Sequence, residues 1–391
     1  MSTFDFDAEP GLVARMKIFG VGGAGKNAVN HMVEAGVPGV DFVVANTDSQ
    51  DLAGSNVKYK IQLGHEITRG LGAGANPDVG RKAAEESRDL IAEHLTDIDM
   101  VFITAGMGGG TGTGAAPVIA QIAKELGVLA VGIVTKPFSF EGSKRTTNAE
   151  TGLAGLKEHV DTVVTIPNQK LKEAVSRNTS FKDALKVADE VLLQATRGIS
   201  DLVILPGLIN LDFADIKTTM ENKGEALMGT GEASGEKRAL EASERAMKHP
   251  LLEDMEIDGA KDILLNITGG HDLTLFDVEE VMTTVQAAAG HTNIIMGTVL
   301  DESFEDKIRV TLIATGLDQA PGSADEMLTR NILKFQPDRP NEMENSALQR
   351  VKRNGFETEE VVTIGDPADD VLDSNALNVP TYMRRRRAFG S

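Results

Sequence analysis

The stretch Gly106-Met107-Gly108-Gly109-Gly110-Thr111-Gly112-Thr113-Gly114 is mostly glycine, and its two threonines add hydroxyl donors. It follows an apolar run at residues 100–105 that predicts a β-strand, and it precedes a predicted helix. Glycine loses more chain entropy on folding than any other residue. A run of glycines is therefore expected where the backbone approaches a ligand closely or adopts positive φ. This loop predicts a binding site at the end of a strand.

Another glycine-rich loop, Gly20-Val21-Gly22-Gly23-Ala24-Gly25-Lys26-Asn27, comes earlier in the chain and is called the first loop, with Gly106 to Gly114 as the second; it follows the first predicted strand and opens the first predicted helix. Free N–H groups and the helix dipole favour an anion there. Taken alone, the loop fits three interpretations. It satisfies the dinucleotide pattern G-x-G-x-x-G, with Asp48 at a tolerable distance for a ribose contact. It nearly satisfies the P-loop, although Asn27 replaces the magnesium-binding Ser or Thr. It could also be a tight turn.

The two loops together favour a polyphosphate ligand. Neither nucleotide pattern of the first loop predicts a second glycine-rich loop. In a parallel sheet both loops leave the carboxyl edge, so they can converge where the strand order reverses. Residues 70–77 and 141–145 are expected to share this rim, and Arg145 could form a bidentate phosphate contact. The alternative for Lys144 and Arg145 is a solvated helix face, which is commoner for an isolated basic pair.

The pattern of apolar residues predicts the α/β fold class. From residue 16 to about residue 167, short apolar runs alternate with amphipathic stretches, as in βαβ units around a parallel sheet. Residues 79–94 predict a helix with Asp78 as its N-cap, and residues 183–199 predict a long helix that could join two domains. The predicted strands are residues 16–20, 41–46, 100–105, 129–135 and 162–166.

Beyond the long helix we predict a second, smaller α/β domain. Its expected helices are residues 234–248 and 275–289, and its expected strands are residues 263–267, 293–299 and 308–314. After residue 317 the chain turns polar, as expected for a flexible linker. The expected divisions are a disordered arm at 1–14, a nucleotide-binding domain at 15–182, a central helix and connection at 183–206, a C-terminal domain at 207–317, a linker at 318–377 and a docking peptide at 378–391.

Composition limits the class of protein and its partners. Apolar residues make up 41% of the 391 residues but aromatics only 4%, which favours an aliphatic α/β interior. The chain has no Cys, which excludes disulfides and thiolate metal sites. The acidic amino terminus and the lack of a membrane-length apolar run predict a soluble, cytoplasmic protein. The net charge of -20 repels phosphate backbones, so nucleic acid is not expected as the main partner.

The second glycine loop, in its part from Gly108 to Gly114, resembles the highly specific nucleotide-binding signature of the tubulin/FtsZ family. The similarity extends through Asn46-Thr47-Asp48, residues 70–77, Phe140-Glu141-Gly142 and residues 206–215, and covers roughly residues 15 to 317. The resemblance implies a GTPase that uses GTP and Mg²⁺, a long central helix, a second domain that activates hydrolysis, and a disordered linker ending in a docking peptide.

The resemblance also implies roles for individual residues. The glycine loops would hold the phosphates, Glu141 and Arg145 would contact the ribose or phosphate region, and Asn27 and Asp189 would contact guanine. Without the resemblance, Asp189 would be interpreted as a solvated helical charge. The expected nucleotide-binding residues are Gly22, Gly23, Ala24, Gly25, Lys26, Asn27, Asn46, Asp48, Ala73, Gly74, Gly106, Gly108, Gly109, Gly110, Thr111, Gly112, Thr113, Glu141, Arg145 and Asp189.

Two positions depart from the family pattern. Leu185 stands where the family often carries an aromatic ring against the base, so stacking would become aliphatic contact. Lys26 stands in a usually glycine-rich part of the first loop, and its ammonium either reaches the phosphates or points to solvent. These departures motivate a competing hypothesis, in which the protein is a filament scaffold that keeps its nucleotide unhydrolysed.

Asn210, Asp212 and Asp215 form the candidate catalytic group. From the residues alone, the preferred interpretation of these acids is helix capping, because an Asp at a helix start accepts backbone N–H bonds. The resemblance reverses this preference, because the loop is similar to one that enters the nucleotide pocket of the next subunit in a filament. The acids would then orient or polarise the attacking water while magnesium neutralises phosphate charge.

The resemblance implies partners and a location as well. The chain would form a head-to-tail homopolymer at the division site beneath the membrane, as a polymerising GTPase of the division ring. Its terminal peptide would bind division regulators and membrane tethers, so that contact with the membrane is indirect. In that peptide Asn378 replaces the usual acid, and the four arginines after Met383 could instead balance nearby acids. A nicotinamide-dependent dehydrogenase, suggested by the first loop alone, is a third hypothesis.

Overall fold

The computed structural model describes residues 14–174, 176, 178–252 and 259–317. The predicted linker at 318–377 and the docking peptide at 378–391 lie outside the described residues, as does nearly all of the predicted arm at 1–14. All of the described residues belong to one structural unit, Met1–Met327. Within that described part, no helix combines the length and apolarity needed to cross a membrane.

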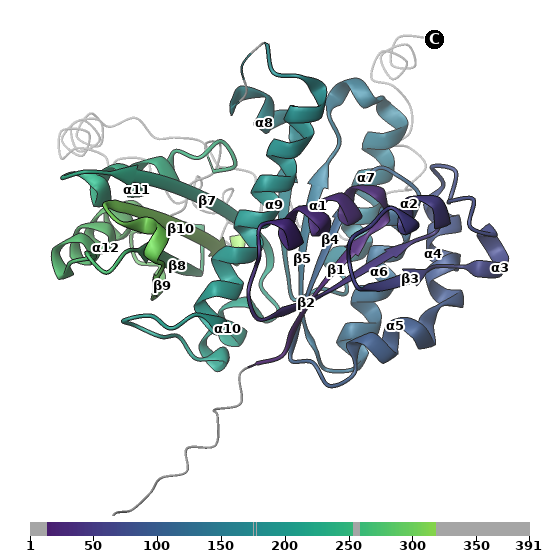
Figure 1. The fold of residues 1–391 in the computed structure, drawn as a ribbon, viewed down its shortest axis with the longest axis horizontal. Coiled ribbons are helices and arrows are strands. Elements are labelled where there is room, and N and C mark those ends of the chain that lie inside the picture. The colour runs from purple at the N-terminus through teal and green to yellow at the C-terminus, as the bar shows by residue number, and fades with distance from the viewer. Residues whose placement is uncertain (1–13, 175, 177, 253–258, 318–391) are drawn as a thin grey trace, which may run out of the picture. The chain divides into compact units, whose positions relative to one another are not determined.

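One ten-stranded sheet runs through the described residues in the order β3-β2-β1-β4-β5-β6-β7-β10-β8-β9 (Figure 1). Neighbouring strands are parallel from β3 to β7, whereas β10 is antiparallel to both β7 and β8. The strand order reverses between β1 and β4. The strands are β1 Met16–Val21, β2 Val40–Asn46, β3 Tyr59–Gln62, β4 Met100–Gly106, β5 Leu129–Lys136, β6 Thr162–Pro167, β7 Gly224–Ser234, β8 Asp262–Gly269, β9 Asn293–Leu300 and β10 Lys307–Thr315.

Helices cover both faces of the parallel part of this sheet (Figure 1). Side chains alternate along β1, so Ile18 packs with α1 and α9 on one face while Phe19 packs with α4 to α7 on the other. A third apolar cluster joins α11 and α12 to β8 and β10. The helices are α1 Gly22–Glu34, α2 Ser49–Ala53, α3 His65–Thr68, α4 Pro77–Glu86, α5 Arg88–Leu95, α6 Thr111–Glu125, α7 Ser143–Lys157, α8 Asn168–Ala174, α9 Phe181–Ile204, α10 Phe213–Met220, α11 Arg238–Met247 and α12 Leu275–Ala289, with short 3-10 turns at η1 Ser139–Glu141 and η3 Glu302–Phe304.

The α/β fold class is confirmed, and each of the five predicted N-terminal strands matches an observed strand to within two residues at each end. The two predicted parts share one continuous sheet, because β6 pairs with β7 over three residues, from Thr162↔Gly224 to Val164↔Ala226. The proposed domain boundaries remain predictions.

The predicted helix at residues 79–94 is wrong in its cap and its continuity. The side chain of Asn76, not Asp78, caps α4 by accepting a 3.0 Å hydrogen bond from the Asp78 N–H, with Pro77 as the first helical residue. The chain then breaks at Ser87, where α4 ends and α5 begins. The buried Ser87 hydroxyl accepts a 3.0 Å hydrogen bond from the Gly64 N–H, which fixes the break against the neighbouring loop.

The predicted helix at residues 234–248 is wrong at its start, because Ser234 ends strand β7 and α11 begins at Arg238. Strand β7 went unrecognised because glycines interrupt its apolar pattern. These glycines have a structural reason. A Cβ on Gly229 would lie 2.1 Å from the Ala246 carbonyl oxygen, and one on Gly231 would lie 2.2 Å from that of Ala242. Only glycine lets α11 pack this closely on the sheet.

The predicted long helix is confirmed and is longer than expected. Helix α9 has 24 residues, begins where the Ser180 hydroxyl accepts a hydrogen bond from the Asp183 N–H, and ends at Ile204. At 1.5 Å per residue it is about 36 Å long. Helices α8 and α10 lie at opposite ends of it (Figure 1).

Asp201 on α9 carries a testable pH dependence. Burial raises its pKa to about 6, against the opposing charges of Arg197 and Arg309. Because this pKa lies above that of the unfolded chain, the folded state binds the extra proton, and stability is lost as the pH rises from about 4 to 6. We expect Asp201→Asn to raise the free energy of unfolding by about 2 kcal/mol at pH 7.5 and to change it little at pH 4. Urea unfolding at both pH values, with exposed Asp41→Asn as the control, measures this; equal effects at both pH values would contradict it.

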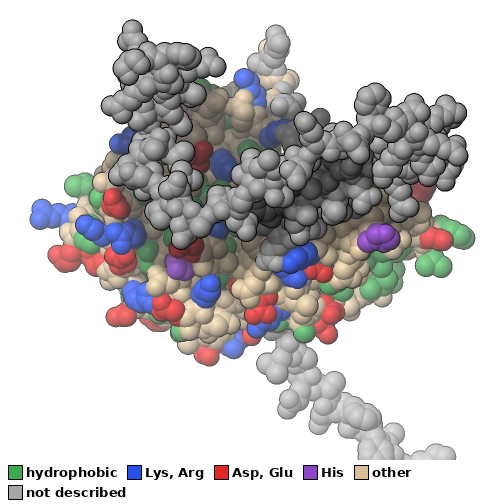
Figure 2. All heavy atoms as spheres, turned by 180° about the vertical axis from the view of Figure 1, so that it is seen from behind, with side chains coloured by type: hydrophobic (Ala, Val, Ile, Leu, Met, Phe, Trp, Pro, Cys, Tyr) green, Lys and Arg blue, Asp and Glu red, His purple; other side chains and the backbone are tan. Residues whose placement is uncertain are grey.

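Charge is distributed rather than concentrated on the visible surface. On the face shown in Figure 2, Lys and Arg side chains are interspersed with Asp and Glu side chains. The acidic side chains visible on that face therefore do not form one separate patch.

Candidate nucleotide-binding site

The two glycine loops meet at the carboxyl edge of the sheet. Strands β1 and β4 are parallel neighbours with Gly20 opposite Thr104, so the loops that follow them leave the sheet side by side. Gly22 has a φ of +71°, and a Cβ there would lie 2.9 Å from the Gly112 backbone nitrogen. The loops are therefore in contact, and they meet where the strand order reverses. This is where open α/β sheets bind ligands.

Two helix N-termini open at this meeting point. Helix α1 follows Val21 and helix α6 follows Gly110, and neither residue caps its helix with a side chain. Neither helix has an acidic residue in its first turn. Their unpaired N–H groups and positive dipole ends are therefore available to an anion.

A cavity of about 460 Å³ lies between the loops. This volume falls within the range of small-molecule sites. The wall is drawn from the ends of β1, β4 and β5 and the residues that follow them, from the starts of α1, α6, α7 and α8, from η1 and from α9. It consists of Val21, Gly22, Gly23, Ala24, Gly106, Met107, Gly109, Gly110, Thr111, Gly112, Thr135, Pro137, Glu141, Arg145, Asn168 and Leu185.

The structure brings about half of the predicted nucleotide-binding residues into this wall. Those in the wall are Gly22, Gly23, Ala24, Gly106, Gly109, Gly110, Thr111, Gly112, Glu141 and Arg145. Those outside it are Gly25, Lys26, Asn27, Asn46, Asp48, Ala73, Gly74, Gly108, Thr113 and Asp189. Several of the second group support the wall from behind. A Cβ on Gly110, for example, would lie 2.7 Å from the Cβ of Ala73.

The two threonines of the second loop have different positions. The Thr111 hydroxyl lies in the wall, 2.6 Å from the hydroxyl of Thr47, and so ties the second loop to the end of β2. Thr113 is buried, and its hydroxyl accepts a 2.8 Å hydrogen bond from the Gly108 N–H. Thr113 therefore stabilises the loop from inside. This position differs from the expectation that its hydroxyl reaches the ligand.

Glu141 and Arg145 form an ion pair on one side of the cavity. Glu141 also accepts a 2.9 Å hydrogen bond from the Phe138 N–H, which fixes it in the 3-10 turn η1. The Arg145 side chain is about half exposed. The guanidinium is thus held at the cavity rim with donors left for a phosphate or ribose oxygen.

Asn46 and Asp48 are committed to local structure. The Asp48 carboxylate accepts hydrogen bonds from the N–H groups of Gln50 and Asp51 and so caps α2. The Asn46 amide donates a 2.7 Å hydrogen bond to the Asp51 carboxylate, which also pairs with Lys26. The Lys26 ammonium thus takes neither of its two expected positions.

The far end of the cavity is bounded by α9. Leu185 lies in the wall, and Asp189 lies one turn later on the same face of the helix. Burial raises the pKa of Asp189 to about 6, and the nearby charge of His31 opposes this shift. His31 in turn lies one turn after Asn27 on α1. The two predicted guanine contacts are therefore carried by two helices that pack against each other.

Asn168 is a site residue that the sequence analysis missed. It is buried directly after β6, it lines the cavity, and its side-chain oxygen has no hydrogen-bond partner among the described residues. An unpaired buried amide oxygen beside a cavity favours a ligand that donates a hydrogen bond. The signal was its position, since residue 168 follows a predicted strand at the same sheet edge as both glycine loops.

We expect Asn168→Ala to weaken guanine-nucleotide binding by about tenfold while leaving thermal stability within about 1 kcal/mol, because the lost oxygen bonds no described residue. Titration calorimetry and a thermal melt measure the two effects. Unchanged affinity would show that the amide oxygen does not face the nucleotide. Asn56→Ala, which removes an exposed amide outside the cavity wall, is the control.

The candidate catalytic residues lie at the other end of α9. The Asn210 side-chain oxygen accepts a 2.7 Å hydrogen bond from the Gly207 N–H. Asp212 caps α10 by accepting a 2.8 Å hydrogen bond from the Asp215 N–H, and Asp215 is exposed. Capping, the interpretation favoured by the residues alone, is therefore what Asp212 does within this chain.

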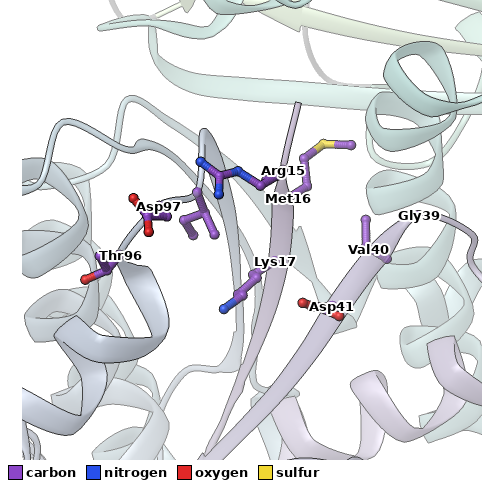
Figure 3. A pocket seen from close by; sticks show the side chains of 9 residues that line it. Arg15, Met16, Lys17, Gly39, Val40, Asp41, Thr96 and Asp97 are labelled. Carbon is purple, nitrogen blue, oxygen red and sulfur yellow. The ribbon is translucent and has the colours of Figure 1, made fainter. Parts of the chain in front are cut away.

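A second hollow of about 460 Å³ lies at the opposite edge of the sheet. Figure 3 shows Lys17 on β1, Arg15 directly before that strand, Asp41 on β2, and Asp97 on the loop before β4. The Lys17 ammonium donates a 3.0 Å hydrogen bond to the His94 carbonyl. This hollow is at the amino ends of the strands, and ligands of open parallel sheets bind at the carboxyl ends. The cavity between the glycine loops is therefore the candidate nucleotide site.

Comparison with known proteins identifies both parts of the chain. Residues 15–176 match the GTPase domain of the Tubulin/FtsZ family, and residues 224–318 match the C-terminal domain of the FtsZ family. The chain is 47% identical over 373 residues to a cell division protein FtsZ of Coxiella burnetii, covering 95% of this chain and 96% of that protein.

Solved structures give the same result. An FtsZ dimer of M. jannaschii is 48% identical, with a TM-score of 0.75, covering 78% of this chain and 89% of that one. CetZ1 from Haloferax volcanii, solved as a GDP-bound monomer, is 22% identical with a TM-score of 0.68, covering 78% and 96%, and shares the fold.

A cavity at the switch point of a parallel sheet, facing two uncapped helix N-termini, defines a protein that binds a polyphosphate nucleotide. The family matches make that class specific: the chain belongs to the tubulin/FtsZ family, as a GTPase of its FtsZ branch. The resemblance drawn from the second glycine loop is confirmed. The dinucleotide and P-loop interpretations of the first loop are set aside, because both describe other families.

Proposed function

We propose that this chain is a polymerising GTPase of the division ring, in which GTP is hydrolysed at the interface between successive copies. One observation carries the proposal. Leu185 borders the cavity near the start of α9, while the loop with Asp212 and Asp215 follows its end. About twenty helical residues, or about 30 Å, separate the two positions. Acids so far from the cavity of their own chain can act only in the cavity of another copy.

The proposed chemistry follows from what the acids can do. In the composite site a water molecule attacks the γ-phosphorus of GTP, the bond to the bridging oxygen breaks, and GDP and phosphate are released. Asp212 and Asp215 of the neighbouring copy would orient or polarise that water. The helix N-termini and Arg145 would stabilise the charge on the phosphate oxygens. Asn210 would hold the loop that presents the acids.

Magnesium is part of this proposal. Among the described residues, no group of three His, Asp or Glu side chains could hold a metal ion. Mg²⁺ in nucleotide sites is bound largely through phosphate oxygens and water, with one or two protein oxygens. We therefore propose that it enters with GTP, where it would neutralise phosphate charge.

Exposed apolar side chains at both ends of the molecule support head-to-tail assembly. Leu71, in one of the segments predicted to share the cavity rim, is 84% exposed, and Phe140, directly before the other, is 67% exposed. Leu275 and Phe276 at the start of α12 are both 79% exposed. The loop that carries Asp212 and Asp215 lies near Leu275 and Phe276. Ile209 in this loop hydrogen-bonds to Thr298, which lies beside the carboxyl end of β8. From that end of β8 the chain leads directly to α12. Different apolar patches on opposite ends form the kind of heterologous contact that builds filaments.

Location and partners complete the proposal. The curated relative is named for cell division, so we propose action in the cytoplasm at the division site, beneath the membrane. Division regulators and membrane tethers would bind residues 378–391, and the membrane would be reached only through them.

The proposal predicts a threshold in protein concentration. GTP turnover per molecule should be near zero in dilute protein and should rise as copies assemble, because each active site needs two copies. Phosphate release and sedimentation, measured together across a concentration series with GTP and with GDP, test this. Assembly without phosphate release would favour a scaffold that keeps its nucleotide.

A further inference from the structure

An ion pair between Lys26 and Asp51 lies against the first glycine loop. The Lys26 ammonium contacts Oδ1 of Asp51, with the lysine side chain 11% exposed and the aspartate side chain 32% exposed. The other carboxylate oxygen, Oδ2, accepts a 2.7 Å hydrogen bond from the Asn46 amide. In the described part of the chain, Lys26 is the only cation within ion-pair distance of Asp51.

The carboxylate of Asp51 lies close to the expected phosphates. Its Oδ2 is 3.6 Å from the point that a Cβ on Gly23 would occupy, and Gly23 lines the cavity. A negative charge at this place repels a polyphosphate, and the repulsion is stronger in a partly buried site than in water. Without a cation beside it, Asp51 would therefore oppose nucleotide binding.

The same pair joins three elements that build the cavity. Lys26 is on α1, Asp51 is on α2, and Asn46 ends β2. The next residue, Thr47, meets Thr111 of the second loop through a 2.6 Å contact between their hydroxyls. Asp51 thus anchors α2 to the first loop, and Lys26 makes that anchor electrically neutral.

We propose that Lys26 is a positioning residue that neutralises Asp51, so that the Asp51 carboxylate can support the glycine loops around the phosphates without repelling the phosphates. The inference rests on the nucleotide occupying the cavity between the glycine loops. Lys26 then affects phosphate affinity through Asp51, without contacting the phosphates itself.

The test compares Lys26→Met, Asp51→Asn and the double variant with the wild type, by titration calorimetry below the assembly concentration. The ligands are GTP, GDP and guanosine. We expect Lys26→Met to weaken GTP binding by at least about tenfold, GDP binding less, and guanosine binding by under about twofold, because the repulsion acts on phosphate charge. Adding Asp51→Asn should restore GTP binding to within about threefold of wild type. Raising the salt concentration should shrink the loss in Lys26→Met.

Two results would overturn the inference. Equal GTP affinity in Lys26→Met and in the double variant would mean that the lysine acts on the phosphates itself. An equal loss for guanosine would mean that the pair only maintains the fold. Arg88→Met, which removes an exposed ion pair with Glu125, is the matched control and should change no affinity. If the wild-type protein does not bind GTP, both the proposed function and this inference are wrong. If the wild type binds GTP but the variants do not show the expected affinities, only this inference is wrong.

Discussion

Replacing Asp212 with alanine is expected to reduce GTP turnover by at least about 100-fold while GTP binding is unchanged. The reason is geometric, since Asp212 follows the end of α9 and the cavity lies beside its start. The variant therefore keeps an intact cavity but can no longer complete the cavity of the next copy. Phosphate release above the assembly concentration and calorimetric GTP binding measure the two effects.

Asp212 also caps α10, so alanine alone does not separate charge from capping. Asparagine does, because it is as good an N-cap as aspartate and carries no charge. If the charge matters, Asp212→Asn is as inactive as Asp212→Ala. If Asp212 is only a cap, Asp212→Asn turns over GTP at the wild-type rate, which would contradict the account. Asp215→Ala, at an exposed carboxylate, is expected to lose activity without the capping effect.

Gly108→Ala is expected to lower the free energy of unfolding by at least about 2 kcal/mol and to weaken GTP binding by at least about tenfold. Gly108 has a φ of +103°, which alanine rarely adopts, and a Cβ there would lie 2.8 Å from the Arg145 carbonyl oxygen. The new methyl group would push apart the second glycine loop and the start of α7. Urea unfolding and GTP titration measure the result.

The neighbouring Gly109 provides the matched control. It has no atom within 4 Å of its added Cβ position and no positive φ. Gly109→Ala should therefore keep the stability of the wild type. Equal stabilities of Gly108→Ala and Gly109→Ala would show that the loop does not have the described conformation.

The sequence predicted the parts of the fold whose signals are local. Strands β1 and β4 are apolar runs with a glycine at or next to their carboxyl ends. The parallel arrangement places the two loops that follow them at one edge of the sheet, so the sequence alone predicts that the loops converge. The long helix α9 was likewise visible from its periodicity. Its true end at Ile204 was not, because apolar residues continue past the predicted boundary at residue 199.

Other features depend on contacts between distant segments. The break at Ser87 needs the Gly64 N–H, and strand β7 depends on how closely α11 approaches its glycines. The position of Lys26 depends on Asp51, which belongs to a different helix and had no motif of its own. Asn168 stands out only when its unpaired oxygen is seen beside the cavity. Such tertiary pairings leave no periodic trace in the sequence.

A mixing experiment tests the shared active site most directly. Gly109→Glu, in a position with room for a side chain, is expected to block the cavity with a negative charge while keeping Asp212. Asp212→Ala keeps the cavity but lacks the acid. Each variant alone should release almost no phosphate from GTP, and an equimolar mixture should release it well above the sum of the two. A mixture no more active than that sum would contradict a site built from two copies.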